Sequence, residues 1–287
     1  MSILLLGSTG MLGTAISQSL KAKGIDVLGV ARKNSDFDAD ISNKSSLIQI
    51  LSLKKYDALI NAAALVNIDY CENNPHEGWK VNTEPVATLA NWSQEFDIPL
   101  LHISTDHYYH YGDNLAHTET DPVFLLNSYA KQKYAAEAYA LTSSHSLVIR
   151  TSILGQRRTQ EKSLIEWAIN SLEDGKKINL FRDAWTSSID VCSFSYFVCK
   201  LFFEMNVRGL LNLAAREVYS KETLIRSIAD SLGLKHDQCT SESIEKYFPS
   251  RPNCLGLNVS RAEHILGHRL PTMQEVCNTL IIDLAKR

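Results

Sequence analysis

A short apolar strand, a glycine-rich turn and a helix follow one another directly at the start of the chain, and this order constrains the fold most. The run from Ser2 to Leu6 is typical of a buried parallel strand. Thr14 to Lys23, closed by Gly24, has the pattern of a helix. Between them, glycine is needed where backbone approaches a phosphate, and the helix N-terminus would attract that anion. The sequence therefore predicts a dinucleotide pyrophosphate site at Gly7-Ser8-Thr9-Gly10-Met11-Leu12-Gly13.

The residues that follow the second predicted strand, Asp26 to Val30, indicate which dinucleotide binds. A site for NAD would place a carboxylate here to accept a hydrogen bond from the ribose 2′-hydroxyl. The chain has Arg32 and Lys33 instead, and two cations suit a 2′-phosphate. We therefore predict NADP(H) as the cofactor, with NAD(H) as the alternative.

Tyr129 and Lys133 form a candidate catalytic pair. They are four residues apart in a stretch that has a helical pattern, so both side chains lie on one helical face. An ammonium near a phenol stabilises the phenolate and lowers the phenol's pKa. A tyrosine of this kind can donate or accept a proton near neutral pH.

Strand and helix patterns alternate along the first half of the chain, which indicates a Rossmann-type, doubly wound α/β fold with a parallel sheet. We expect a dinucleotide-binding domain over residues 1–152 and 190–215. The remaining residues, 153–189 and 216–287, would form a smaller, mostly helical lobe that binds substrate. The elements expected after the second strand are strands at Tyr56 to Ile60, Leu100 to Ile103, Leu147 to Arg150, Ile178 to Phe181 and Gly209 to Ala214, and helices at Trp79 to Glu95, Leu164 to Leu172 and Val191 to Phe203.

Ligands of such sheets bind beyond the carboxyl ends of the strands, so the residues that follow each strand are candidates for the site. Asn61-Ala62-Ala63-Ala64-Leu65-Val66 follows the third strand, and its small residues let backbone lie against a flat ring or a phosphate. Ser104-Thr105-Asp106 follows the fourth strand, and Thr151-Ser152-Ile153 follows the fifth.

Composition excludes several other classes of protein. The net charge of the 287 residues is −3 and no basic tract is present, which argues against nucleic acid as a partner. No apolar stretch approaches the length of a membrane span, and the start lacks the pattern of a signal peptide. The six cysteines are scattered without a C-x-x-C pair, which favours a reducing, cytoplasmic location and gives no support for a metal site.

Taken together, these motifs resemble the extended short-chain dehydrogenase/reductases and, within them, the dTDP-4-dehydrorhamnose reductases. The resemblance spans nearly the whole chain. It is carried by the glycine turn and by Asp40-Ile41-Ser42-Asn43, Asn61-Ala62-Ala63-Ala64, Ile103-Ser104-Thr105-Asp106, Tyr129-x-x-x-Lys133, Arg150-Thr151-Ser152, Arg251-Pro252 and Leu270-Pro271.

The resemblance implies a reaction, in which hydride passes from a nicotinamide to C4 of a 4-keto sugar linked to a nucleoside diphosphate. It also implies roles in that reaction: Tyr129 is the acid, Lys133 its partner and a ligand of the nicotinamide ribose, and Thr105 a donor to the ketone oxygen. The cofactor residues it implies are Gly10, Met11 and Leu12 at the pyrophosphate, Asp40 and Ile41 at the adenine, and Ala64, Leu65 and Val66 along the ribose and nicotinamide.

The substrate side departs from the pattern of these reductases. The loop from His107 to Asp113 is bulkier than usual, and Ile153 stands where a tryptophan is common. Trp185 offers a replacement aromatic wall for the sugar, with a place in the core as the alternative. The diphosphate needs cationic or N–H donors, for which Arg251 is the best candidate and Arg157 or Arg158 a weaker one. We also expect Asp106 at the substrate and take His107 and His110 as pocket or surface residues rather than metal ligands.

Two alternatives to a reductase remain open at this point. Nucleotide-sugar epimerases of the same superfamily share the tyrosine and lysine but hold NAD tightly. A non-catalytic, dinucleotide-binding regulatory subunit is the other alternative. A homodimer is compatible with each of these.

Overall fold

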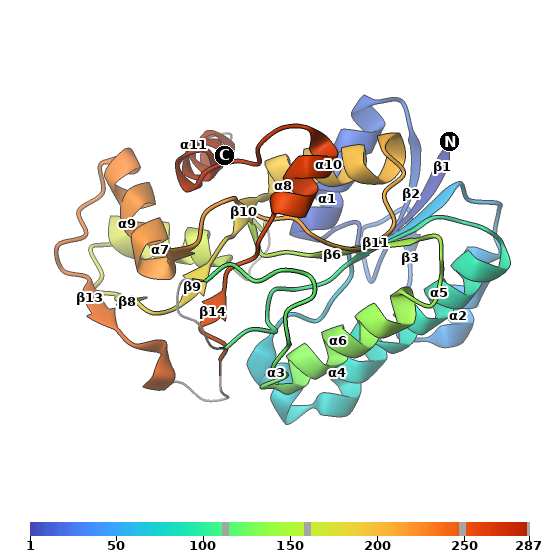
Figure 1. Ribbon diagram of the computed structural model, residues 1–287, viewed down its shortest axis with the longest axis horizontal. Coiled ribbons are helices and arrows are strands. Elements are labelled where there is room, and N and C mark those ends of the chain that lie inside the picture. Colours follow the sequence, from blue (N-terminus) through green and yellow to red (C-terminus); the bar gives the residue numbers. More distant parts are fainter. Residues whose placement is uncertain (111–114, 158–161, 247–250, 286–287) are drawn as a thin grey trace. The chain divides into compact units, whose positions relative to one another are not determined.

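The computed structural model describes residues 1–110, 115–157, 162–246 and 251–285, which group into two compact units (Figure 1). The first unit comprises residues 1–105, 125–150 and 195–211, and the second comprises 106–124, 151–194 and 212–287. Residues 106–124 thus group with the second unit, whereas the sequence-based domain limits placed them with the first. Those limits stay a prediction.

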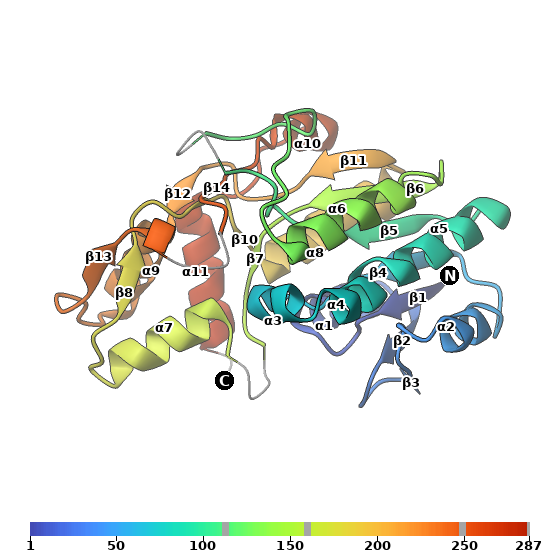
Figure 2. The same cartoon turned by 90° about the horizontal axis from the view of Figure 1, so that it is seen from below.

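A seven-stranded sheet organises the first unit, in the order β11-β6-β5-β4-β1-β2-β3. The strands from β6 to β3 pair in parallel, and β1, β4, β5 and β6 are buried almost throughout because helices cover both faces (Figures 1 and 2). This confirms the predicted Rossmann-type fold. The strands are β1 Ser2–Leu6, β2 Asp26–Ala31, β3 Phe37–Asp38, β4 Ala58–Asn61, β5 Leu100–Ile103, β6 Ser146–Arg150 and β11 Gly209–Asn212.

Helix α1 lies on the opposite side of this sheet from α4, α5 and α6 (Figure 1). Residues of β1, β2, β4 and α2 form one core cluster with Leu89 and Ala90 of α5. The helices of the first unit are α1 Met11–Ala22, α2 Lys44–Leu51, α3 Ile68–Asn73, α4 Pro75–Asn82, α5 Glu84–Glu95 and α6 Ser128–Ala140, with a π-helical turn at Lys200–Glu204. Helix α8, Val191–Cys199, is divided between the two units.

One predicted helix was wrong in its extent. The stretch Trp79 to Glu95 forms two helices, because the chain breaks at Thr83 (φ −118°, ψ −56°) between α4 and α5. Pro85 explains the break, since proline lacks an N–H and its ring clashes with the carbonyl four residues earlier.

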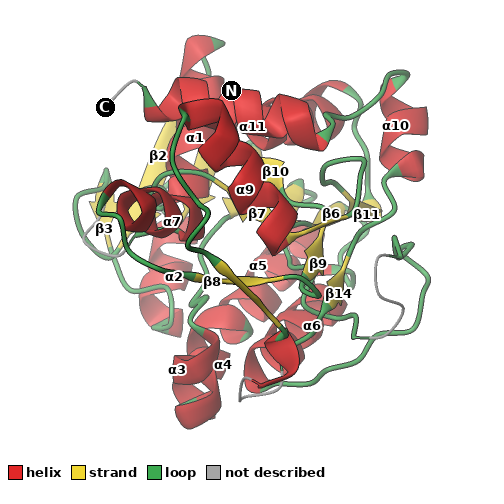
Figure 3. Cartoon of the chain, turned by 90° about the vertical axis from the view of Figure 1, so that its left-hand side faces the viewer, coloured by secondary structure: helices red, strands yellow, loops and turns green. Residues whose placement is uncertain are grey.

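The second unit has its own core, in which α7 (Leu164–Glu173) and α9 (Lys221–Leu232) pack together (Figure 3). Ala168 and Leu172 of α7 meet Ile225 and Ala229 of α9 there. The other elements of this unit are β7 Ile153–Leu154, β8 Asn179–Phe181, β9 Trp185–Thr186, β10 Ile189–Asp190, β12 Tyr219–Ser220, β13 Thr240–Glu242, β14 Cys254–Leu255, α10 Ser260–Leu266 and α11 Met273–Leu284, with a 3₁₀ turn at Ile244–Lys246.

Within the described part of the chain, no helix combines the length and the apolar character needed to span a membrane.

Candidate active site

In the predicted glycine turn, backbone segments pack so closely that only glycine fits at two positions. Gly7 has φ +79°, and a Cβ there would lie 2.7 Å from the backbone nitrogen of Ala63. A Cβ at Gly13 would lie 2.1 Å from the Gly7 carbonyl oxygen. Helix α1 begins directly after Gly10, which caps it without a side chain, so the first N–H groups of α1 stay available. The turn is therefore shaped to let an anionic ligand meet backbone, which fits a dinucleotide pyrophosphate.

The loop after β4 is fixed by two buried asparagines. Asn61 accepts a hydrogen bond from the Ala63 backbone N–H at 3.2 Å. The Asn82 amide both accepts from the Leu65 N–H at 2.8 Å and donates to the Leu65 carbonyl at 3.0 Å. Ala64 and Val66 stay exposed beside this anchored backbone. The loop thus presents a small, fixed, partly apolar surface next to the glycine turn.

The β2 end carries both cations and a carboxylate. Arg32 and Lys33 are exposed, as expected for residues that would meet a 2′-phosphate. Sequence reasoning missed Asp36, whose carboxylate accepts from the Gly29 N–H at 2.8 Å. A Cβ at Gly29 would lie 2.8 Å from the Ser8 side chain and 3.1 Å from the Asp36 carboxylate, so this acid lies close to the glycine turn. The missed signal was the short strand β3, which pairs in parallel with β2 and brings the preceding residue 36 back beside β2.

Of the residues expected at the adenine, Asp40 is exposed and accepts from the Ser42 N–H at 2.9 Å. Ile41 is buried in the core cluster that also holds Leu6 and Val30, the ends of β1 and β2. Both therefore lie on the first unit, and their contact with adenine stays a prediction.

Helix α6 carries the predicted catalytic pair. Its N-cap, Asn127, accepts from the Ala130 N–H at 2.9 Å and so fixes the first turn, where Tyr129 lies. Tyr129 is 7% exposed, and Lys133, one turn on, is 1% exposed. The Lys133 ammonium donates to the Ile103 carbonyl at 2.7 Å, at the end of β5 and two residues before Thr105. The structure thus brings Lys133 to the strand end that carries the Thr105 hydroxyl.

The surroundings of Lys133 tune its charge. Burial lowers the pKa of its ammonium to about 8, and the Glu137 carboxylate opposes this fall. His102 of β5 is fully buried, and its pKa lies well below the usual value because of burial and the charge of Lys133. The His102 ring is held by the Asn61 amide at 3.2 Å. A neutral histidine next to a buried lysine leaves that lysine as the cation of the site.

The second unit holds most of the residues predicted at the substrate. Asp106 is buried, and its carboxylate lies 3.9 Å from Nε2 of His107. Burial, with the charges of Lys221 and Arg251, lowers the pKa of His107 to about 3, so its ring is neutral at physiological pH. Burial also lowers the pKa of Lys221, which Asp106 opposes and Arg251 reinforces. Asp106, His107, Lys221 and Arg251 therefore lie close together, and they comprise one carboxylate, one neutral ring and two cations.

A small three-stranded sheet explains why Lys221 and Arg251 lie near each other. Strand β9 pairs antiparallel with β12 and parallel with β14. The Lys221 N–H, just after β12, bonds the Ala184 carbonyl at 3.0 Å, and the Trp185 N–H bonds the Asn253 carbonyl at 2.8 Å. The start of β9, the end of β12 and the approach to β14 thus share one sheet end. Lys221 escaped the sequence analysis because only this non-local pairing brings it close to Arg251.

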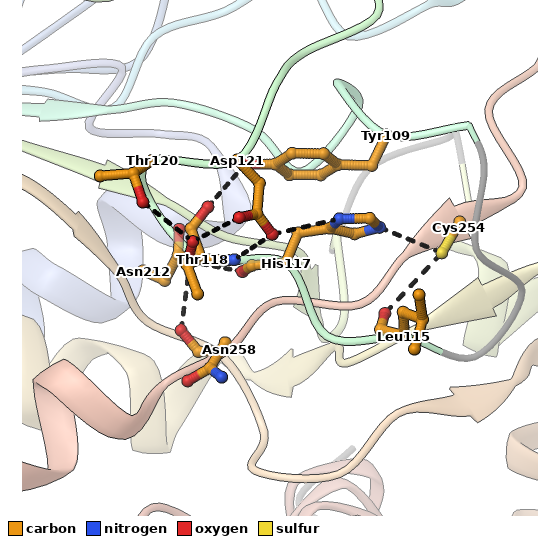
Figure 4. A network of polar contacts seen from close by, with 9 residues as sticks. All are labelled: Tyr109, Leu115, His117, Thr118, Thr120, Asp121, Asn212, Cys254 and Asn258. Carbon is orange, nitrogen blue, oxygen red and sulfur yellow. Dashed lines mark hydrogen bonds and ion pairs between the residues drawn. The ribbon is translucent and has the colours of Figure 1, made fainter.

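The loop that begins at Asp106 is anchored inside the second unit (Figure 4). The rings of Tyr109 and His117 stack with centroids 4.1 Å apart, and His117 Nε2 lies 3.1 Å from Cys254 Sγ. The Asn212 amide donates to the carbonyls of His117 and Asn258. Tyr108 and Tyr109 are both buried, so the bulk of this loop contributes to packing.

The structure describes some of the remaining predicted residues, and their roles stay a prediction. Ile153 pairs with Ile189 across β7 and β10, and Trp185 is partly exposed in β9. Tyr111 to Asp113 and Arg158 lie outside the described residues. Arg157 donates its backbone N–H to Glu166 at 3.0 Å. Among residues that the structure describes, no group of three histidine, cysteine or acidic side chains could hold a metal ion.

The parallel sheet, the glycine turn and the tyrosine–lysine helix define the class of Rossmann-type short-chain dehydrogenase/reductases. The chain belongs to the family described as the RmlD substrate binding domain, whose model matches residues 1–285. This confirms the resemblance inferred from the motifs.

Known proteins similar to this chain agree with that family. A probable low-salt glycan biosynthesis reductase of Haloferax volcanii is 24% identical over 281 residues, covering 94% of this chain and 93% of the relative. The dTDP-4-dehydrorhamnose reductase structure from Clostridium acetobutylicum has a TM-score of 0.88 at 21% identity, with both chains covered completely. That from Bacillus anthracis, in complex with NADP, has a TM-score of 0.87 at 19% identity and covers 98% of this chain and 99% of its own. These structures share the fold.

Proposed function

We propose that this protein reduces the ketone of a 4-keto nucleoside-diphosphate 6-deoxysugar, with NADPH as the reductant and Tyr129 as the proton donor. The observation that supports this most is the buried Lys133 ammonium, four residues after Tyr129 on α6 and bonded to the strand end that carries Thr105. A buried cation at this place has a clear use in proton transfer, and the reductase names of the relatives agree with it.

The roles of the side chains follow from where negative charge develops. When bound, reduced nicotinamide supplies the hydride to the carbonyl carbon. Tyr129 donates its phenolic proton to the ketone oxygen, while the Thr105 hydroxyl donates a hydrogen bond to the same oxygen. Lys133 stays cationic and stabilises the phenolate that Tyr129 leaves behind.

For the cofactor, the glycine turn fits a dinucleotide, since the space that Cβ atoms at Gly7 and Gly13 would fill is taken by backbone. Arg32 and Lys33 support NADPH, and the NADP complex of the Bacillus anthracis reductase agrees. Asp36 is the one observation that favours the epimerase alternative, because a carboxylate near the glycine turn suits the 2′-hydroxyl of NAD.

For the substrate, we propose that Lys221 joins Arg251 in binding the diphosphate, with Asp106, Ile153 and Trp185 at the sugar. Two cations against one buried carboxylate leave an excess of positive charge in that neighbourhood, which an anionic ligand would balance. A homodimer and a cytoplasmic location remain predictions.

A panel of 4-keto nucleoside-diphosphate sugars, monitored by NADPH absorbance at 340 nm, tests the proposal. We expect consumption of NADPH with at least one 4-keto-6-deoxysugar and a product reduced at C4. Purified protein that carries bound NAD and interconverts sugar epimers would support the epimerase instead. Dinucleotide binding without turnover of any sugar would support a regulatory subunit.

A further inference from the structure

A buried ion pair lies behind the catalytic helix and has no part in the mechanism above. Glu137 of α6 and Arg150 at the end of β6 are 2% and 3% exposed. The Arg150 Nε donates to both Glu137 oxygens, at 3.0 and 3.2 Å, and Nη2 donates to Oε2 at 2.8 Å. Burying such a pair is costly, and replacing it by apolar side chains is often neutral or stabilising, so stability alone is a weak reason for it.

The pair is connected to the strand end that carries the site. The Ser104 hydroxyl donates to Glu137 Oε1 at 2.6 Å. Ser104 lies between Ile103, whose carbonyl accepts from Lys133, and Thr105. One carboxylate therefore holds the segment that orients the catalytic lysine and the hydroxyl expected at the ketone.

Glu137 also stands one helical turn after Lys133, on the same face of α6. Of the charges near Lys133, the Glu137 carboxylate raises the pKa of the lysine. His102 of β5 is neutral, and burial raises the pKa of Cys71 of α3 to about 11, so its thiol stays protonated. Glu72 of α3 also bonds α6, but it accepts a hydrogen bond from the N–H of Ser128, the first residue of that helix.

Among the described residues, the buried faces of α4 and α5, which also pack on α6, bring no further charge to this place. The buried residues of α5 are apolar apart from Ser93, and those of α4 are Gly78 and Asn82. Glu77 and Lys80 of α4 pair with each other at 3.7 Å on the exposed side.

We propose that Glu137, paired with Arg150, is a positioning residue that keeps Lys133 cationic and fixes the strand end through Ser104. This inference rests on the proposed reductase function. It adds a reason for the buried ion pair, because the Glu137 carboxylate offsets the cost of keeping the Lys133 ammonium out of water, while the Arg150 guanidinium bonds that carboxylate.

The test measures the titration of Lys133 directly, by NMR of protein labelled with ¹³C at lysine Cε, the signal being assigned with Lys133→Met. We expect the wild-type lysine to titrate near pH 8. In Glu137→Gln the midpoint should move to lower pH, and the high-pH limb of the kcat profile should move with it. A displacement of one pH unit lowers the cationic fraction about tenfold above the midpoint.

Because Glu137→Gln leaves Arg150 buried without its carboxylate, this variant is expected to lose stability. The double variant Glu137→Gln/Arg150→Met removes both charges and keeps the experiment interpretable. If the pair is only structural, the double variant regains both stability and the wild-type titration of Lys133. If Glu137 acts as proposed, stability recovers while the titration stays displaced.

Two controls isolate the effect. Glu84→Gln removes one exposed carboxylate from α5 and should leave the Lys133 titration unchanged. Ser93→Ala removes a buried hydroxyl bonded to the Ile98 carbonyl at 2.6 Å and should lower stability without moving the titration. An unmoved Lys133 midpoint in both Glu137 variants overturns the inference, whether or not the protein reduces a ketone. A moved midpoint in a protein that turns over no sugar would instead overturn the proposed function.

Discussion

At the scale of single residues, the candidate site contains a lysine that is buried away from water. Lys133 is 1% exposed, and its ammonium has one backbone acceptor, the Ile103 carbonyl. Burial of a cation costs free energy, which appears here as a pKa lowered to about 8. A buried charge that lowers the stability of the fold is typical of residues retained for function rather than for stability.

Replacing Lys133 by methionine should therefore stabilise the protein while abolishing reduction. In the folded state the lysine binds its proton less tightly than in the unfolded state, whose pKa is 10.5. Its cost is full below pH 8 and disappears as the pH rises to 10.5, so the gain from Lys133→Met should be about 1–3 kcal/mol at pH 7 and fade by pH 10. Urea unfolding at both pH values measures this. If Lys133→Met has a lower free energy of unfolding than wild type at pH 7, the lysine makes a net stabilising contribution to the fold.

At the scale of elements, the glycine turn and the β2–β3 return are the segments that we propose to bind the dinucleotide. The turn can form because Gly7 and Gly13 lack a Cβ. A Cβ would clash where Gly7 approaches Ala63 and where α1 approaches Gly7. Because β3 pairs with β2, Asp36, four residues after Arg32, lies close to the glycine turn.

The glycine turn predicts a clear effect of Gly13→Ala. The added Cβ would meet the Gly7 carbonyl oxygen at 2.1 Å, so the backbone must shift, at a cost of about 1–3 kcal/mol. NADPH binding, followed by nicotinamide fluorescence, should weaken about tenfold or more. Gln18→Ala, on the exposed face of the same helix, serves as the control and should bind as wild type. Unchanged binding in Gly13→Ala would place the dinucleotide elsewhere.

The β2–β3 return predicts how the cofactor preference changes. Wild type should bind NADPH more tightly than NADH, and the double variant Arg32→Ala/Lys33→Ala should lose about tenfold for NADPH alone. Asp36→Asn should weaken NADH more than NADPH. Dissociation constants for both cofactors in the three proteins decide this, and tighter binding of NADH by wild type would contradict the predicted preference.

At the scale of the whole molecule, the two units hold different parts of the proposed chemistry. The first contains the glycine turn, Tyr129, Lys133 and Thr105, and the second contains the cations Lys221 and Arg251. Cofactor binding and diphosphate binding should therefore respond to different substitutions.

Lys221→Met should raise the KM for the nucleotide sugar about tenfold and leave kcat and the NADPH dissociation constant close to wild type, because it removes binding that ground state and transition state share. Lys176→Met is the matched control, since Lys176 is exposed and paired with Asp174 at 2.8 Å. Steady-state kinetics with both substrates measure the effect. An unchanged KM would remove Lys221 from the substrate site.

Local patterns in the sequence predicted much of the first unit. The glycine turn, β1, β5 and the helix with Tyr129 and Lys133 were foreseeable because each is encoded by neighbouring residues. The break at Thr83 was also encoded locally, by Pro85, and was overlooked. Asp36, Lys221 and the burial of Glu137 against Arg150 were not foreseeable, because each depends on how strands pair or how a helix packs on the sheet. For Lys221 the paired segments are also distant in sequence.

The most direct test of the account is ketone reduction by Tyr129→Phe, compared with Tyr134→Phe on the same helix, whose side chain is 38% exposed. Both variants should bind NADPH as wild type does. We predict that Tyr129→Phe loses at least about a hundredfold in kcat, the share expected of a general acid, while Tyr134→Phe keeps wild-type turnover. Near-normal turnover in Tyr129→Phe would contradict the assignment of this tyrosine as the proton donor.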